Sequence, residues 1–488
     1  MSNLQFENLQ FASKKFVGKF VTTENVRVSV KNDIVRVLSV GVDSVVNSYE
    51  IKGGEATFFG KSFIRFLYTD GTTIAGSSYN TDFSSAFSTD LADDSKLVFD
   101  VQTESVQTEI NSNTATISIV LEVSVFAYAK QSLAVLCGGD VFLNKESLQT
   151  TGDVCVQTLP IVLEQQLTTS KTIDTVLVAE SSVSATKSTL AGDVLQIEGT
   201  GVCKLTYVSQ GSVTTEAIDF VFAQEVDGTG LKNNVFATLD VKQTKVRLSI
   251  EDDSINNTFT LEILANVATE SSQQNVVEVA TDAYGTSCDF QLERTVATTT
   301  LPCGSVVANK TVGATLPWDK NHKLLTFVNA YATVTNCTSQ EKLAKVEGYV
   351  TATCLYQTDV GTESKLVEIP FLQNVEMDFL LPMCSTSAKI KVGAVEGVAN
   401  ENLEVSAKLA LTLQATRDFC HHVVVGATEL PFDKSSLPAI EVCVGKKGET
   451  IWSLAKSLHM DQKDLLATNP ELTNPLEKDT RIVVFNGI

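Results

Sequence analysis

Apolar and polar residues alternate with a period of two in three widely separated segments of the chain. The apolar positions are Ile117, Ile119, Leu121 and Val123, then Phe259, Leu261 and Ile263, and finally Leu403, Val405, Ala407, Leu409 and Leu411. Only a strand with one buried face requires this period, because successive side chains point to opposite faces. The pattern therefore predicts one such strand in each third of the chain.

A second motif also occurs three times, and it defines a repeat. A glycine is followed, after seven residues, by a tyrosine that ends a strand-like run, at Gly60–Tyr68, Gly199–Tyr207 and Gly348–Tyr356. The repeat period is therefore roughly 140–150 residues. Glycine and tyrosine share one face of the strand, so we expect the glycine on the buried side, where a neighbouring strand can approach closely.

An aromatic residue follows each glycine–tyrosine run after a polar turn. These residues are Phe83, Phe220 and Phe371. A strand, a turn and a second strand predict one hairpin in each repeat. The repeated tyrosines could also form a recurrent binding surface, but matched positions in a strand usually reflect core packing. We therefore expect the repeated glycines, tyrosines and phenylalanines to be structural.

Abundant Val and Thr, and the lack of a helical period before residue 440, predict a mainly β protein. We divide it into three tandem β-sandwich-like repeats at residues 1–150, 151–285 and 286–426. The stretch from Val306 to His322, which carries Trp318, is expected to be a loop.

The composition of the sequence changes after Gly426. Residues 427–439 contain two prolines and a run of polar residues, which predicts a linker. Residues 440–488 predict a small domain of order β-α-α-β, in which Thr450 caps the first helix and Asp461 the second. The first helix would begin at Ile451, and His459 is expected to be a surface or cap residue.

Composition and charge exclude several classes of function. Lys and Arg number 37 against 58 Asp and Glu, and a net charge of −21 repels nucleic acid. The ten cysteines are scattered and include no C-x-x-C pair, which argues against a disulfide scaffold and a zinc ribbon. The N-terminus has no export signal, so a cytoplasmic location is expected.

Candidate chemistry is sparse, and we expect neither catalysis nor a cofactor. The chain has four histidines and no glycine-rich phosphate loop. Cys420, His421 and His422 form the one cluster of soft ligands. Adjacent residues on a strand point to opposite faces, so we expect no metal site, although the sequence does not decide whether this cluster binds one.

The C-terminal residues resemble a LysM domain. The resemblance rests on the run from Lys447 to Ala455, on Asn469-Pro470 and on the final Ile-Val-Val strand. Glu449 stands where the family usually has Asp. The resemblance implies a groove for N-acetylglucosamine chains, and either a glycan or a protein could occupy it. Its two sides would be formed by Gly448, Glu449, Thr450 and Ile451, and by Asn469, Pro470, Glu471 and Leu472.

Three β-repeats followed by such a domain resemble the SPOCS-repeat, LysM-containing spore coat morphogenetic proteins (SipL- and SpoVID-like) of endospore-forming bacteria. The repeat markers are the glycine–tyrosine run and Ile369-Pro370-Phe371. The resemblance implies a non-enzymatic scaffold of the spore envelope, located in the mother cell at the forespore surface or spore coat. It would dock to a protein there and could self-associate. The alternative is a cell-wall protein that binds peptidoglycan or another N-acetylglucosamine polymer.

Overall fold

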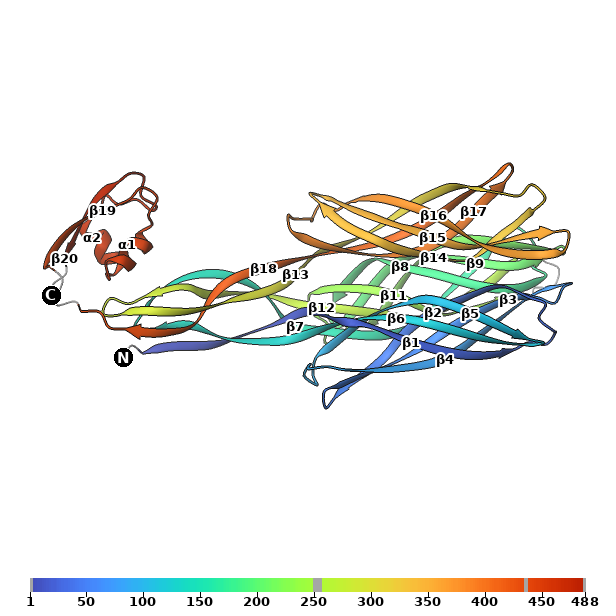
Figure 1. Ribbon diagram of the computed structural model, residues 1–488, viewed down its shortest axis with the longest axis horizontal. Coiled ribbons are helices and arrows are strands. Elements are labelled where there is room, and N and C mark those ends of the chain that lie inside the picture. Colours follow the sequence, from blue (N-terminus) through green and yellow to red (C-terminus); the bar gives the residue numbers. More distant parts are fainter. Residues whose placement is uncertain (1–2, 249–256, 434–437, 486–488) are drawn as a thin grey trace.

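The computed structural model describes residues 3–248, 257–433 and 438–485, and most of these residues lie in β-strands. Figure 1 shows an elongated molecule with a broad head of strands, a narrower stalk and a small C-terminal unit near the stalk tip. The N-terminus lies at the same end as this unit. The stalk therefore separates the C-terminal unit from the head.

The first repeat consists of two three-stranded sheets. Its strands are β1 (Leu4–Ser29), β2 (Arg36–Lys52), β3 (Glu55–Thr69), β4 (Ile74–Ser88), β5 (Lys96–Asn111) and β6 (Thr114–Gly139). One sheet has the order β1-β6-β5 and the other is the meander β2-β3-β4. All the pairings are antiparallel.

The second and third repeats have the same topology. The second consists of β7 (Phe142–Thr168), β8 (Thr175–Ala191), β9 (Val194–Ser209), β10 (Ser212–Asp227), β11 (Asn234–Leu248) and β12 (Thr258–Tyr284). The third consists of β13 (Asp289–Pro317), β14 (Lys323–Gln340), β15 (Leu343–Thr358), β16 (Gly361–Glu376), β17 (Cys384–Ala399) and β18 (Asn402–Leu430). The predicted mainly β architecture with repeated sheets is confirmed.

The alternating segments form the central strands of the long sheets. Ile117, Leu121, Phe259, Ile263 and Leu411 are all fully buried, on β6, β12 and β18. In each repeat these side chains join those of the meander sheet in a single hydrophobic core. The period of two therefore marks the face that lies between the two sheets of each repeat.

The repeated glycines make room for aromatic rings from the neighbouring strand. Gly60 pairs directly with Phe83, and a Cβ atom at Gly60 would lie 2.1 Å from the Phe83 ring. Gly348 pairs with Phe371 in the same way. In the second repeat the partner of Gly199 is Phe222.

The sequence analysis took Phe220 as the counterpart of Phe83 and Phe371. The counterpart is instead Phe222, two residues further along β10. Phe220 pairs with Gly201 instead, and both Phe220 and Phe222 are buried. The second repeat carries two glycine–phenylalanine pairs on one face of the hairpin, and the sequence prediction selected the wrong one.

Two further expectations differ from the structure. Val306 to Pro317 belongs to β13 and pairs with β18, so only the residues from Trp318 to His322 form a loop. The Trp318 ring is buried against Tyr356, and its indole N–H donates to the His322 carbonyl at 3.0 Å.

Two of the predicted domain limits fall inside strands, and the limit at residue 285 lies between β12 and β13. The limit at residue 150 falls inside β7, and residues 427–430 of the expected linker are the end of β18. Both strands extend because they pair with another long strand of the same repeat beyond the head.

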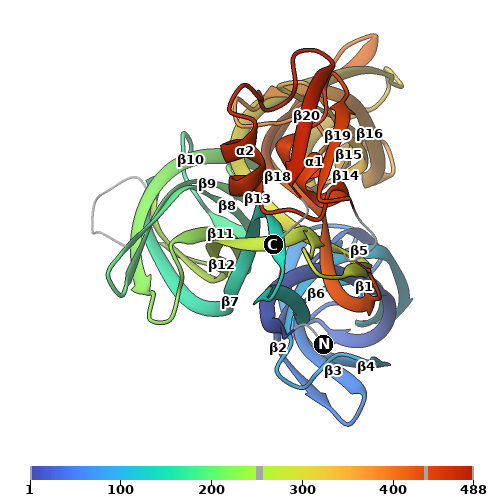
Figure 2. The ribbon, with the colours of Figure 1, turned by 90° about the vertical axis from the view of Figure 1, so that its left-hand side faces the viewer.

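Each repeat contributes two strands of 26–29 residues, whereas its other four strands have 15–18 residues. Their outer halves pack together around Val135, Val279 and Val423, which are almost fully buried. Figure 2 shows the three repeats as lobes around a common axis. The stalk is therefore a core shared by all three repeats.

The three repeats also contact one another within the head. Leu67, Leu177 and Leu355, one from each repeat, share a buried cluster. Arg65 Nε donates to Glu180 Oε1 at 3.2 Å, and Lys204 Nζ lies 3.1 Å from Glu180 Oε2. Burial alone would raise the pKa of Glu180, but the charges of Lys204 and Arg65 outweigh it and lower that pKa. The Glu180 carboxylate, which lies between the first and second repeats, is therefore paired with Arg65 and Lys204.

Candidate functional site

The C-terminal unit (residues 438–485) pairs two short strands and packs two helices on one face of them. Its elements are β19 (Ile440–Gly445), α1 (Ile451–Ser457), α2 (Gln462–Thr468) and β20 (Thr480–Phe485). Apolar residues at helical spacing, including Leu454, Ala455 and Leu465, fill its core. No helix among the described residues is long and apolar enough to cross a bilayer.

The loop between β19 and α1 is shaped by its own hydrogen bonds. Gly448 adopts a φ of 89°, which glycine tolerates, and its N–H donates to the Leu476 carbonyl at 2.8 Å. The Glu449 carboxylate accepts from the Lys446 N–H at 2.6 Å. Thr450 is the N-cap of α1 and forms a capping box with Ser453. The predicted helix start is confirmed.

Two of the predicted groove residues are buried and have structural roles. Ile451 is 3% exposed and belongs to the core, while its N–H donates to Asn474 Oδ1 at 3.1 Å. Asn469 is 2% exposed, and its amide joins the end of α2 to β20 through bonds to Leu465 and Val483. Neither side chain is available to a ligand in this arrangement.

The remaining groove residues differ in exposure. Gly448 and Thr450 are exposed on the first loop, and Pro470 and Glu471 are exposed on the second. We call these four residues the exposed rim. Glu449 is half-buried, and Leu472 packs partly against the core. The first loop is hydrogen-bonded to residues 474–476, which the sequence prediction had not included in the groove.

The unit is docked on the stalk through Asp282 of β12. Trp452 Nε1 donates to Asp282 Oδ2 at 2.9 Å, and Lys456 Nζ to Asp282 Oδ1 at 2.6 Å. Arg294 of β13 reaches the same carboxylate at 2.7 Å. Burial alone would raise the pKa of Asp282, but the hydrogen bonds from Lys456 and Trp452 outweigh it and lower that pKa.

Tyr284, the last residue of β12, completes the core of the C-terminal unit. Its ring is 3% exposed, stacks on Phe142 with centroids 5.1 Å apart and meets the Trp452 ring edge-on at 4.9 Å. Its hydroxyl donates to the Met460 carbonyl at 2.9 Å. Burial, followed by the charge of Asp461, raises the pKa of Tyr284 to about 12. A repeat residue thus serves as a core residue of the small unit.

His459 adds a further contact between the two parts. Its Nε2 lies 2.8 Å from Asp289 Oδ1, and its ring stacks on Phe432 with centroids 3.8 Å apart. His459 has a φ of 52° just after α1, so it does end the helix, as expected, while its side chain bridges to the stalk. The docking residues Asp282, Tyr284 and Asp289 were not found from the sequence.

The other candidate residues lie in the repeats. Tyr68, Tyr207 and Tyr356 are 0–8% exposed, which places them in the cores and not on a binding surface. Cys420 and His422 are exposed on β18, and His421 between them is half-buried. Among the described residues, no group of three or more His, Cys, Asp or Glu side chains is placed to hold a metal ion.

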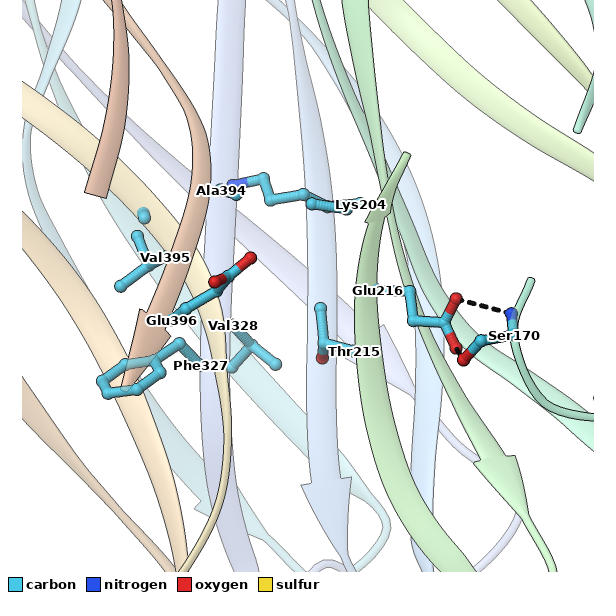
Figure 3. A pocket seen from close by; sticks show the side chains of 11 residues that line it. Ser170, Lys204, Thr215, Glu216, Phe327, Val328, Ala394, Val395 and Glu396 are labelled. Carbon is cyan, nitrogen blue, oxygen red and sulfur yellow. Dashed lines mark hydrogen bonds between the residues drawn. The ribbon is translucent and has the colours of Figure 1, made fainter. Parts of the chain in front are cut away.

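A cavity of about 330 Å³ lies between the second and third repeats. Figure 3 shows Lys204, Thr215 and Glu216 on one side of it and Phe327 on the other. Glu216 already accepts from the Ser170 N–H at 2.9 Å and from the Ser170 hydroxyl at 2.6 Å. Because Lys204 is also paired, with Glu180, the charges on this side of the cavity are satisfied by the protein itself.

Comparison with known proteins identifies one part of the chain. Residues 446–484 match the LysM domain family. No curated protein and no solved structure matches the chain. The match covers the loop with the exposed rim, both helices and most of the closing strand. The C-terminal unit that docks on the stalk through Asp282 and Tyr284 is therefore a LysM domain.

Proposed function

We propose that this chain is a non-enzymatic binding protein whose LysM domain holds N-acetylglucosamine polymers, such as peptidoglycan, at its exposed rim. The family match carries this proposal, because LysM domains support binding to such polymers. It favours the glycan-binding alternative of the sequence analysis over docking to a coat protein.

The docking of the LysM domain on the stalk leaves the exposed rim open to a ligand. The stalk contacts Trp452, Lys456 and the segment from His459 to Met460. Gly448, Thr450, Pro470 and Glu471 stay exposed in this docked arrangement. A polymer can therefore reach the rim without release of the domain from the stalk.

The distribution of charge is also compatible with a polymer ligand. Residues 440–488 contain six Lys or Arg and seven Asp or Glu, so most of the net charge of −21 belongs to the repeats. Like charges on the head would repel anionic wall polymers at low salt. The stalk places the nearly neutral LysM domain away from that head (Figure 1).

Retention of the purified chain on insoluble peptidoglycan and on chitin tests the proposal. We expect saturable retention, and we expect Pro470→Arg, which changes the rim without altering a cap or the core, to weaken it at least tenfold. Leu466→Arg is the matched control, because Leu466 is 39% exposed on α2 outside the rim. Absence of saturable retention on both polymers, or equal loss with the two variants, would contradict the proposal.

A second function is proposed from the resemblance of the repeats, namely a scaffold of the spore envelope. Apolar side chains on the head support lateral contacts with a coat protein or a second copy, since Val221, Val360 and Leu366 are 69–75% exposed. A fluorescent fusion imaged through sporulation should then gather at the forespore surface. A uniformly cytoplasmic fusion, together with a monomer at high concentration, would exclude the scaffold.

A further inference from the structure

A second cavity, of about 480 Å³, lies in the head between the first and second repeats. Strands β2, β3 and β4 form one wall, and β7, β11 and β12 form the other. Its volume is in the range typical of small-molecule sites. It is part of neither the LysM domain nor the docking contact, so it raises a separate question of function.

Two β-bulges aim polar side chains at this cavity. The register of β2 against β3 shifts between Val46 and Ser48, which leaves Asn47 as the bulged residue. The register of β11 against β12 shifts between Val241 and Gln243, which leaves Lys242 in the same position. Both Asn47 and Lys242 line the cavity. Bulges commonly redirect a side chain beside a functional site.

The amide side chains of the cavity lack partners. Asn266 is 3% exposed, yet within the described part of the chain its side chain makes no hydrogen bond. The side chains of the exposed Asn47 and Asn80 and of the half-buried Gln243 make no hydrogen bond there either. None of these amide atoms is among the buried groups without a partner, so the amides face the open cavity and are free to bond a ligand.

The cavity also contains an excess of positive charge. Lys61 and Lys242 both line it, and only Lys61 has an acidic partner among the described residues, Asp82 at 3.1 Å. Burial, and then the charge of Lys61, lower the pKa of Lys242. The charge of an anion in the cavity would oppose both effects by raising the pKa of Lys242.

At the equivalent position between the second and third repeats, the polar side chains pair with one another. Asp219 occupies the place of Asn80, and Lys408 the place of Leu264. These two residues form an ion pair at 3.9 Å. The protein supplies both charges there, whereas the cavity between the first and second repeats has one unpaired ammonium group among the described residues.

The third equivalent position is also satisfied by the protein. Glu122 of β6 occupies the place of Asn266, and Lys19 pairs with it at 2.6 Å. Unpartnered amides beside an unpaired lysine are therefore a property of the cavity between the first and second repeats and not of the repeat itself.

We propose that this cavity binds a sugar acid, a small ligand that carries both hydroxyl groups and a carboxylate. Lys242 pairs with the carboxylate. The amides of Asn47, Asn80, Gln243 and Asn266 both donate and accept, which matches hydroxyl groups better than a bare anion does. Phe63 and Leu264 supply the apolar part of the wall against which a sugar ring packs.

Titration calorimetry of the full-length chain with sodium glucuronate, glucose and inorganic phosphate tests this site. We expect saturable binding of one glucuronate per chain, with glucose and phosphate at least tenfold weaker. Lys242→Met and Asn266→Leu should each reduce the glucuronate affinity at least tenfold. Lys408→Met, which removes the lysine of the equivalent position between the second and third repeats, should leave that affinity unchanged.

Three results would overturn the proposal. They are no saturable binding of glucuronate, phosphate binding as tightly as glucuronate, and Lys242→Met binding like the parent chain. The rim variant Pro470→Arg should bind glucuronate normally, so failure of this site and failure of the LysM glycan site are distinguishable.

Discussion

The three repeats and the LysM domain differ in how they obtain a hydrophobic core. The core of the second repeat is built from residues of that repeat alone, between Ile161 and Val267. The core of the LysM domain includes Tyr284 of β12, and Phe142 of β7 packs against it. The sandwich core of each repeat is thus formed by that repeat alone, although the stalk core is shared, whereas the LysM domain uses two aromatic residues from the stalk.

Size explains this difference. A domain of fewer than about 50 residues buries a small fraction of its surface, and its own core supplies little stability. Docking adds apolar contacts from Tyr284 and polar contacts from Asp282. The same contacts fix the orientation of the exposed rim relative to the stalk. In this molecule, positioning of the binding domain and its stability therefore share one interface.

The largest effect is expected from a charge placed in a repeat core. Tyr207 is fully buried, and its hydroxyl donates to Glu216 at 2.5 Å. Tyr207→Asp would bury a carboxylate beside Glu216 without a partner, which costs several kcal/mol and unfolds the second repeat. Thermal unfolding followed by circular dichroism should show a large decrease in Tm.

Tyr331→Asp is the control for this prediction, since Tyr331 is 50% exposed on β14. It should melt like the parent chain. Equal melting of Tyr207→Asp and the parent would show that the repeats tolerate a defect in their cores, and the contrast with the LysM domain would be lost.

A smaller and more local effect is expected at the shared interface. Tyr284→Ala removes a buried ring from the LysM core and should cost about 3–5 kcal/mol in the stability of the docked domain. In a Trp318→Phe background Trp452 is the one remaining tryptophan, so its fluorescence reports on the LysM domain. We expect a red shift at a temperature at which the repeats remain folded.

Tyr331→Ala serves as the control, because it removes an equal ring from an exposed strand position. If Tyr284→Ala left the Trp452 signal and its melting unchanged, the LysM domain would be as self-sufficient as the repeats.

Local patterns in the sequence were sufficient for most of the fold. The period of two at Ile117–Val123 identified a buried face, and Thr450 and Asp461 marked both helix starts of the LysM domain. These signals act between residues close in the chain. The choice of Phe220 over Phe222 failed because two glycine–phenylalanine pairs lie one pleat apart, and spacing alone does not fix the register.

Contacts between distant segments could not be predicted in the same way. Asp282 and Trp452 are far apart in the chain, and each alone looks like an ordinary surface or core residue. The loop expected from Val306 to His322 is a strand because β18 extends far enough to pair with it. The groove was predicted only in part, since Ile451 and Asn469 are used by the LysM fold itself.

The smallest expected effect concerns the charge of Asp282 and its dependence on pH. The docked state lowers the pKa of this carboxyl, so its contribution is complete above the pKa of the undocked group, about 3.9, and is lost as the pH falls through the lower docked value. The Trp452 signal should stay constant from pH 8 to about pH 5 and change in more acidic solution.

Asp282→Asn should weaken docking by roughly 1–2 kcal/mol at neutral pH, because Lys456 and Arg294 lose a charged acceptor, and it should reduce the acid transition. Asp464→Asn, on the exposed part of α2, should leave that transition unchanged. An unaltered acid transition in Asp282→Asn would show that Asp282 does not cause it and would leave the docking to the rings of Tyr284 and Trp452.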